Sequence, residues 1–269
     1  MTMVSVRRVA EYEEQALDQA ISDHFEALHV AEDLTPDTRV LIKPNLLAAR
    51  APSQAVCTHP ALVAAIARWL KKQGVKQIVL ADSPGGTYNL AVLEKLYAVS
   101  GMKELEGLVT LNRDVTYGAK NGFAILTPIL QADYIIDCAK CKTHGLTVMS
   151  GAVKNLFGCI PGLKKPEWHC KRPTVDGFSD LLIDLCETVR PNLTVLDAID
   201  CMEGNGPGGG TVRHMGVTLC SRSPYAVDEQ AAKLMGLGDK QAPIIRAARR
   251  RGFPADGITL AGDELPIAD

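Results

Sequence analysis

The feature that most constrains the fold is the alternation of strand and helix patterns along the whole chain. Short runs rich in apolar and β-branched residues predict strands at 3–9, 39–45, 77–86, 132–140, 192–199 and 216–221. Between them, apolar residues recur every three or four positions, which predicts helices at 13–30, 59–74, 89–101, 146–158, 175–190 and 223–236. This order predicts an α/β fold, with a mainly parallel sheet flanked by helices on both faces.

No part of the sequence marks a domain boundary. It contains neither a Pro/Ser-rich linker nor an internal repeat of about 20–50 residues. We therefore expect a single α/β domain over residues 1–269. The least regular stretch, 105–130, predicts a small inserted lobe or hairpin.

Charge and hydropathy exclude several classes of partner. The formal net charge is -2, so we expect no nucleic-acid partner and no attraction to an anionic membrane. No apolar run approaches the ~18 residues that span a bilayer. The N-terminal residues lack an apolar core followed by a cleavage site, so we expect a cytoplasmic protein.

Polar residues follow several of the predicted strands. In open α/β sheets, ligands bind in the crevice beyond the carboxyl ends of the strands. We therefore expect a site there, built from residues at these strand ends: Lys43, Asn45, Asp82, Ser83, Asp197, Glu203 and Asn205.

The familiar phosphate and nucleophile motifs are absent. The stretch GNGPGG at 204–209 matches the spacing of a dinucleotide-binding loop, but the residues after it predict a strand instead of the required helix. The sequence has no Walker P-loop motif and no G-x-S-x-G elbow.

The sequence KTHG at 142–145 lies between a predicted strand and a predicted helix. The start of a helix beside Lys142 and His144 predicts a site for an anion. Lys154 and Asn155 follow two to three turns later in that helix. Each of them also fits a structural role, as a solvated charge and as a hydrogen-bonded amide in the core.

Cysteines suggest a different kind of site in the same region. An iron–sulfur cluster or a divalent metal is the alternative cofactor, with these ligands: Cys138, Cys141, Cys159 and Cys170. Their spacing is incomplete for a ferredoxin cluster or a closed zinc site. A redox dithiol at Cys138 and Cys141 is a further alternative.

Several motifs together resemble the uncharacterised family called domain of unknown function 362. They are VLIKPNLL, THP, DSPGG, KTHGLTVMSGAVKNLFGCIPGLKK, EGNGPGGG and SPYAVDEQAAKLMG, between about residues 38 and 236. Some members carry a C-terminal ferredoxin-type domain, which this chain lacks, and the family name implies no activity. The resemblance implies roles for Lys43, Lys142, Lys154, His169 and Asp228 among others, but not for the cysteines. The N-terminal half also resembles the strand–helix layout of lactate-racemase-like proteins, without their motifs.

These observations lead to three hypotheses. The first is an enzyme acting on a small anionic, phosphate- or carboxylate-bearing metabolite by proton transfer or isomerisation, with catalytic residues drawn from His144, His169, Asp82, Asp197 and Glu203. Its ligand would be held by Lys43, Asn45, Ser83, Lys142, Lys154, Asn155 and Asn205. The second is an iron–sulfur or metal-binding redox protein with a redox partner protein. The third is a non-catalytic module that binds an anion.

Overall fold

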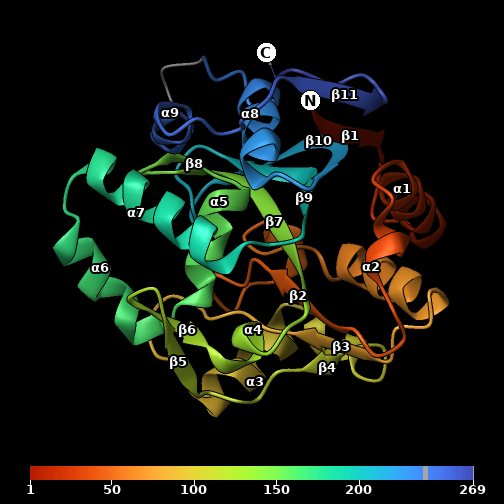
Figure 1. The fold of residues 1–269 in the computed structure, drawn as a ribbon, viewed down its shortest axis with the longest axis horizontal. Helices are drawn as coiled ribbons and strands as arrows, with labels where there is room; N and C mark the ends of the chain where they lie inside the picture. Colours follow the sequence, from red (N-terminus) through yellow and green to blue (C-terminus); the bar gives the residue numbers. More distant parts are fainter. Residues whose placement is uncertain (239–241, 269) are drawn as a thin grey trace.

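The computed structural model of the protein describes residues 1–238 and 242–268, and a nine-stranded sheet runs through them (Figure 1). Eight strands form a continuous series in the order β11 (Ile258–Gly262), β1 (Thr2–Arg8), β10 (Thr211–Ser221), β9 (Leu193–Glu203), β7 (Tyr134–His144), β2 (Arg39–Pro44), β3 (Gln77–Leu80) and β4 (Thr110–Leu111). The ninth, β8 (Val148–Ser150), pairs with β7.

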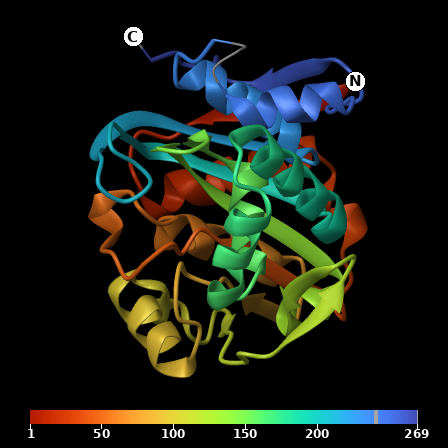
Figure 2. The ribbon, with the colours of Figure 1, turned by 90° about the vertical axis from the view of Figure 1, so that its left-hand side faces the viewer.

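The sheet is mainly parallel, as predicted. Strands β9, β7, β2, β3 and β4 form one parallel block, and β10 pairs antiparallel with both β9 and β1. Strand β10 directly follows the GNGPGG loop, which confirms that this loop does not open a helix. Because β1 pairs with β11, both ends of the chain lie at the same end of the molecule (Figures 1 and 2).

Three helices cover one face of the sheet: α1 (Glu14–Ala27), α2 (Pro60–Lys72) and α3 (Leu90–Val99). Helix α2 shows why these residues form a helix at this position. Pro60 occupies its first turn, and the ring of His59 accepts a hydrogen bond from the backbone N–H of Ala61. Its apolar stripe, which includes Leu62 and Ile66, is buried against the sheet.

The opposite face is covered by helices from the second half of the chain (Figure 2). They are α5 (Ala152–Asn155), α7 (Val175–Val189), α8 (Pro224–Leu234) and α9 (Pro243–Arg250). The short helix α6 (Lys165–Lys171) lies between α5 and α7 in the chain. Helices therefore flank both faces of the sheet, which confirms the predicted α/β class.

The irregular stretch at 105–130 contains a hairpin outside the main sheet. Strands β5 (Tyr117–Lys120) and β6 (Phe123–Leu126) pair antiparallel, and α4 (Thr127–Leu130) follows. Asn121 and Gly122 form the turn with φ of 49° and 82°, the positive values that a two-residue hairpin turn requires. The predicted insertion is thus a hairpin, while β4 from the same stretch joins the main sheet.

The helix predicted at 146–158 is wrong. Strand β7 continues through His144, turns, and pairs with β8, so that Val148 is exposed while Met149 and Ser150 are buried. Only residues 152–155 are α-helical, followed by a 3-10 turn at Leu156–Cys159. The apolar spacing matched a helix, but backbone pairing with the end of β7 satisfies the same residues in an extended conformation.

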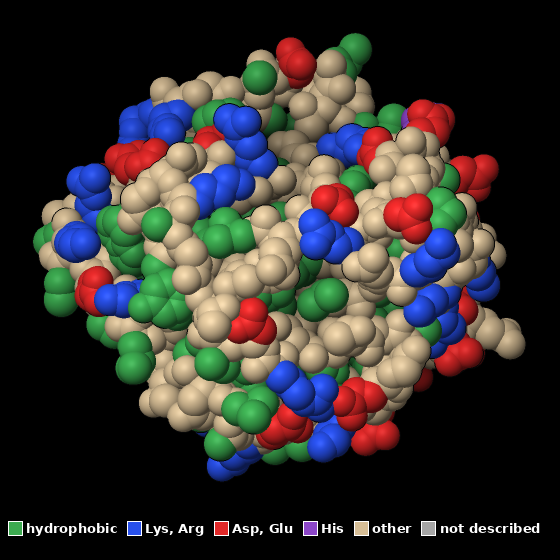
Figure 3. Space-filling model, turned by 60° about the horizontal axis from the view of Figure 1, so that its bottom comes forward, with side chains coloured by type: hydrophobic (Ala, Val, Ile, Leu, Met, Phe, Trp, Pro, Cys, Tyr) green, Lys and Arg blue, Asp and Glu red, His purple; other side chains and the backbone are tan. Residues whose placement is uncertain are grey.

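The outer surface gives no sign of a membrane span or of a single-sign charged patch on the face drawn in Figure 3. Within the described residues, no helix combines the length and the apolar character needed to cross a bilayer. On that face, acidic and basic side chains are interspersed. This mixture is typical of a solvated surface.

Candidate functional site

A cavity of about 300 Å³ lies beyond the carboxyl ends of β2, β3 and β7. Its remaining walls come from residues 150–169 and from Pro207 in the loop after β9. It brings together eight residues selected from the sequence: Asn45, Asp82, Ser83, Lys142, His144, Lys154, Asn155 and His169. We refer to it below as the lysine pocket, because Lys142, Lys154 and Lys165 all line it.

Lys142 is fixed at one end of a hydrogen-bond network. Its ammonium group donates to Oδ1 of Asn45 at 2.9 Å and to the carbonyl oxygen of Val56 at 2.6 Å. Asn45 donates through Nδ2 to Oδ1 of Asn155, which donates through its own Nδ2 to Oδ1 of Asp137 at 2.7 Å. The network therefore fixes the orientation of both amide groups between a buried lysine and a buried carboxyl group.

Burial shifts the pKa values at both ends of this network toward neutrality. Desolvation lowers the pKa of Lys142 to about 7, and the nearby charge of Lys154 contributes in the same direction. Desolvation raises the pKa of Asp137 to about 8, since its Oδ2 is buried without a hydrogen-bond partner. Both groups therefore favour their uncharged forms much more than they do in water.

The other two lysines of the pocket differ in their partners. Lys165 donates to the carbonyl oxygens of Ser83 at 2.5 Å and Pro84 at 2.9 Å. Among the described residues, the amine of Lys154 has neither a hydrogen-bond acceptor nor a carboxylate partner. It lies 5.7 Å from the ring centroids of both Phe157 and Phe178. Desolvation lowers the pKa of each of these two lysines to about 8.

His144 is held as a neutral ring. Its Nδ1 accepts hydrogen bonds from the backbone N–H groups of Leu146 and Thr147, at 3.1 and 3.3 Å. The ring proton is therefore on Nε2, which can donate to a ligand. Burial, together with the nearby lysines, lowers the pKa of His144 to about 3. His169 is exposed on α6 and stacks on Phe178 with centroids 4.4 Å apart.

Below the pocket, Lys43 and Asp82 form a buried ion pair at 2.8 Å. Burial alone would lower the pKa of Lys43, but the Asp82 carboxylate, together with Cys159 and Asp137, outweighs this effect and raises that pKa. The second carboxylate oxygen of Asp82 accepts the N–H of Leu46 at 2.6 Å. Gly158 packs so closely on this pair that a Cβ there would lie 1.9 Å from Asp82 Oδ1. Lys43 thus neutralises the carboxylate of the pocket, instead of binding a ligand directly.

The predicted anion site at a helix start is wrong. Lys142 and His144 lie on strand β7, and the next helix in the chain is the single turn α5. The amides at its start, those of Ala152 and Val153, are already bound by the carboxylate of Asp228 at 2.6 and 3.1 Å. The cationic character of the pocket therefore comes from side chains and not from a helix terminus.

Asp197 lies outside the lysine pocket, because β9 continues for six residues beyond it. It forms a second buried ion pair, with Lys140 at 2.9 Å, and accepts hydrogen bonds from the hydroxyl group of Tyr12 and the N–H of His59. These partners occupy both carboxylate oxygens. Asp197 is thus part of the structural core between β7, β9 and the N-terminal segment, and not a group of the pocket.

The remaining two predicted residues, at the end of β9 and in the loop after it, also lie outside the pocket lining. Glu203 is exposed and pairs with Arg213 at 3.1 Å. Asn205 is exposed, and its neighbour Pro207 lines the pocket instead. The loop does approach the site, since the N–H of Gly145 donates to the carbonyl oxygen of Gly206.

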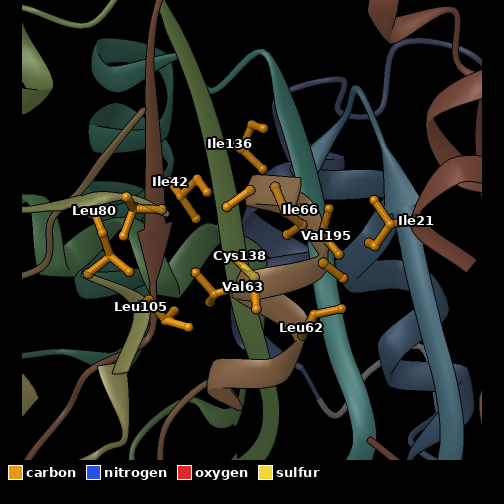
Figure 4. Close-up of a cluster of buried hydrophobic side chains, with 14 of the residues drawn as sticks. Ile21, Ile42, Leu62, Val63, Ile66, Leu80, Leu105, Ile136, Cys138 and Val195 are labelled. Carbon is orange, nitrogen blue, oxygen red and sulfur yellow. The ribbon is translucent and has the colours of Figure 1, made fainter. Parts of the chain in front are cut away.

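The structure does not bring the four cysteines together. Cys138 packs among apolar residues between the sheet and α2 (Figure 4), whereas Cys141 faces the opposite side of the sheet. Cys159 belongs to a third apolar cluster, and Cys170 is exposed on α6. Within the described residues, no three His, Cys, Asp or Glu side chains are arranged to hold a metal ion. The residues present therefore do not fit an iron–sulfur cluster or a metal.

Sequence reasoning missed Lys165 as a pocket residue. It follows Lys164, which is paired with Glu167 outside the pocket lining, and nothing in the local sequence separates the two lysines. The one available signal was its position at the end of the longest motif, which stops at residue 165. Asp137 lies inside strand β7, and its pairing with Asn155 depends on a contact between segments 18 residues apart in the chain.

Comparison with known proteins places the chain in a family. A family described as a domain of unknown function (DUF362) matches residues 40–233. A thylakoid-associated protein of Synechocystis sp. is 30% identical over 256 residues, which cover 93% of this chain and 79% of the relative. The chain belongs to the DUF362 family.

Two solved structures are also similar to this DUF362 protein. The lactate racemase apoprotein of Thermoanaerobacterium thermosaccharolyticum superposes with a TM-score of 0.49 and 13% identity, over 85% of this chain and 55% of the other. A protein from Thermotoga maritima gives a TM-score of 0.44 and 14% identity, over 77% of this chain and 54% of the other. This chain thus spans about half the length of either structure.

Proposed function

We propose that this protein is an enzyme that binds a small metabolite through its phosphate or carboxylate group in the lysine pocket and transfers a proton next to a carbonyl group. The observation that carries this proposal is the charge of the pocket. Three lysines line it, and its one lining carboxylate, that of Asp82, is already neutralised by Lys43. Lys154 has no anionic partner among the described residues, so an anionic ligand would supply the missing counter-charge.

The pKa values assign different chemical roles to the polar groups. His144 is neutral and carries its proton on Nε2, so it acts as a hydrogen-bond donor to the carbonyl oxygen of the substrate. Lys142, with its pKa lowered to about 7, exchanges a proton near neutral pH and acts as the general base. The proton-transfer role expected for a histidine therefore moves to a lysine.

Binding and exchange experiments test this proposal. Inorganic phosphate and pyruvate serve as probes in isothermal titration, and loss of the methyl proton signal of pyruvate in D₂O reports proton transfer. We expect Lys142→Met to weaken binding about tenfold or more, since a hydrogen bond to a charged group contributes about 1.5–3 kcal/mol, and to slow the exchange further. The control Lys76→Met alters an exposed lysine just before β3, at the opposite end of this strand from the pocket. It should change neither the binding of the probes nor the rate of exchange.

Each outcome decides between the hypotheses. Failure of both probes to bind refutes the proposal. Binding without accelerated exchange would instead support a non-catalytic anion-binding module.

A further inference from the structure

We propose that Lys154 is a nucleophile that forms an imine with the carbonyl group of an anionic substrate, such as a 2-oxo acid. This inference rests on the proposed function, because it assigns the substrate class of the same pocket. It extends that function from anion binding and proton transfer to covalent catalysis by an amine.

The three lysines of the pocket are not equivalent as nucleophiles. Lys142 and Lys165 each donate to two oxygen atoms of the protein, which fixes the position of the nitrogen. Lys154 has no such acceptor among the described residues, so its nitrogen is free to approach a ligand in the cavity. Once it has lost its proton, the amine of Lys154 can therefore turn its lone pair toward a carbonyl carbon in the cavity.

The surroundings of Lys154 also favour its neutral form. The rings of Phe157 and Phe178 lie 5.7 Å from the amine, at the outer limit of a cation–π contact, so they stabilise its charged form only weakly. The cations of Lys142 and Lys165 line the same cavity. Desolvation lowers the pKa of Lys154 to about 8, so a substantial fraction of the amine is uncharged at neutral to mildly alkaline pH.

The covalent step uses only the substrate and groups that line the lysine pocket. The lone pair of Lys154 Nζ attacks the carbonyl carbon, and a C–N bond forms as the carbonyl π bond breaks. The carbonyl oxygen takes up two protons, equal in number to the two that the amine nitrogen loses, and leaves as one molecule of water. Lys165 holds the carboxylate or phosphate group of the substrate, and Nε2 of His144 donates to the departing oxygen. The imine nitrogen takes up one proton from solvent, and the resulting iminium acidifies the adjacent C–H bond, which neutral Lys142 deprotonates.

Reductive trapping tests the assignment. The full chain is incubated with pyruvate or with dihydroxyacetone phosphate, and sodium borohydride then reduces any imine to a stable secondary amine. Intact-mass analysis should show one adduct per chain with at least one probe, and peptide mapping should place it on Lys154. The yield should rise between pH 7 and pH 9 as the amine loses its proton.

A matched variant separates charge from nucleophilicity. Lys154→Arg keeps the positive charge but has no nucleophilic amine, so it should bind phosphate within a few-fold of the unaltered protein and give no trapped adduct. An adduct on Lys142 or Lys165 instead of Lys154 would overturn the inference. The inference would also be overturned if the protein bound pyruvate and dihydroxyacetone phosphate and exchanged the methyl protons of pyruvate, but gave no trapped adduct. If neither probe binds, the proposed function itself has failed.

Discussion

The buried ion pair between Lys43 and Asp82 should be one of the largest single electrostatic contributions to stability in this protein. Its two side chains are 0% and 4% exposed, and the charged atoms are 2.8 Å apart. Lys43→Met leaves the carboxylate inside the protein with the N–H of Leu46 as its remaining donor among these contacts. Because an uncompensated charge then stays buried, we expect the free energy of unfolding to fall by about 3–5 kcal/mol.

A double-mutant cycle isolates the contribution of the pair. Asp82→Asn should cost about as much as Lys43→Met, because it leaves the ammonium group with the carbonyl oxygen of Pro44 as its one remaining partner among these contacts. The double variant leaves no unpaired charge, so its loss should be smaller than the sum of the single losses by about 2–3 kcal/mol.

Urea unfolding, followed by circular dichroism, measures all of these energies, provided that the slope against urea stays constant. The matched control is Lys76→Met, since Lys76 forms a pair of similar length with Asp37 but both side chains are largely exposed, at 69% and 86%. It should show no measurable loss. Single losses of Lys43→Met and Asp82→Asn that simply add in the double variant would refute the reasoning.

Three further predictions concern the same region. Gly151→Ala would place a Cβ 2.1 Å from Oδ1 of Asp228 and should lower the free energy of unfolding by about 2–3 kcal/mol in thermal melts. The control Gly257→Ala, whose Cβ would have no atom within 4 Å, should be neutral. Equal effects of the two substitutions would contradict the contact with Asp228. Sulfate, whose charge is constant with pH, should bind the pocket more weakly as the pH rises from 6 to 9. The reason is that the lysines of the pocket, with pKa values lowered to about 7 and 8, lose their positive charge over this range. Calorimetric affinities that stay level would count against these lowered pKa values. The pKa of Asp137 is raised to about 8, so the folded state retains a proton that the unfolded state loses above pH ~4. The free energy of unfolding should therefore fall by up to about 1.4 kcal/mol per pH unit between pH ~4 and pH 8. Asp137→Asn should flatten this decline in urea unfolding across pH, and an unchanged slope would disprove the shift.

Local patterns in the sequence were sufficient for most of the fold. The strand at Arg39–Pro44 and the helix at Pro60–Lys72 carry clear apolar periods and clear boundaries, and the structure contains both. The region from 146 to 158 failed because its apolar spacing fits a helix, while its actual conformation depends on pairing with β7 and on the contact between Gly151 and Asp228. These are contacts with other segments of the chain, which a local period does not report.

The candidate site was predictable to the extent that it lies at strand ends. Asn45 directly follows β2, Asp82 lies two residues after β3, and both line the pocket. Asp197 failed the same rule because β9 extends beyond it, which places the carboxylate within the sheet beside Lys140. The local sequence did not indicate where β9 ends. A polar residue inside a long buried strand looks the same in sequence as a polar residue at the end of a shorter strand.

The side-chain amides of Asn45 and Asn155 couple Lys142 and Asp137 electrostatically but do not transfer a proton between them. Asn45 and Asn155 are aligned donor to acceptor, so a change of charge on Lys142 is felt at Asp137 as a change in the local field. Neither amide group releases or accepts a proton near neutral pH, so the chain does not conduct one. The proton of Asp137 therefore does not pass to Lys142 through these amides. Because this carboxyl group is fully buried, its exchange with solvent requires this part of the sheet to open.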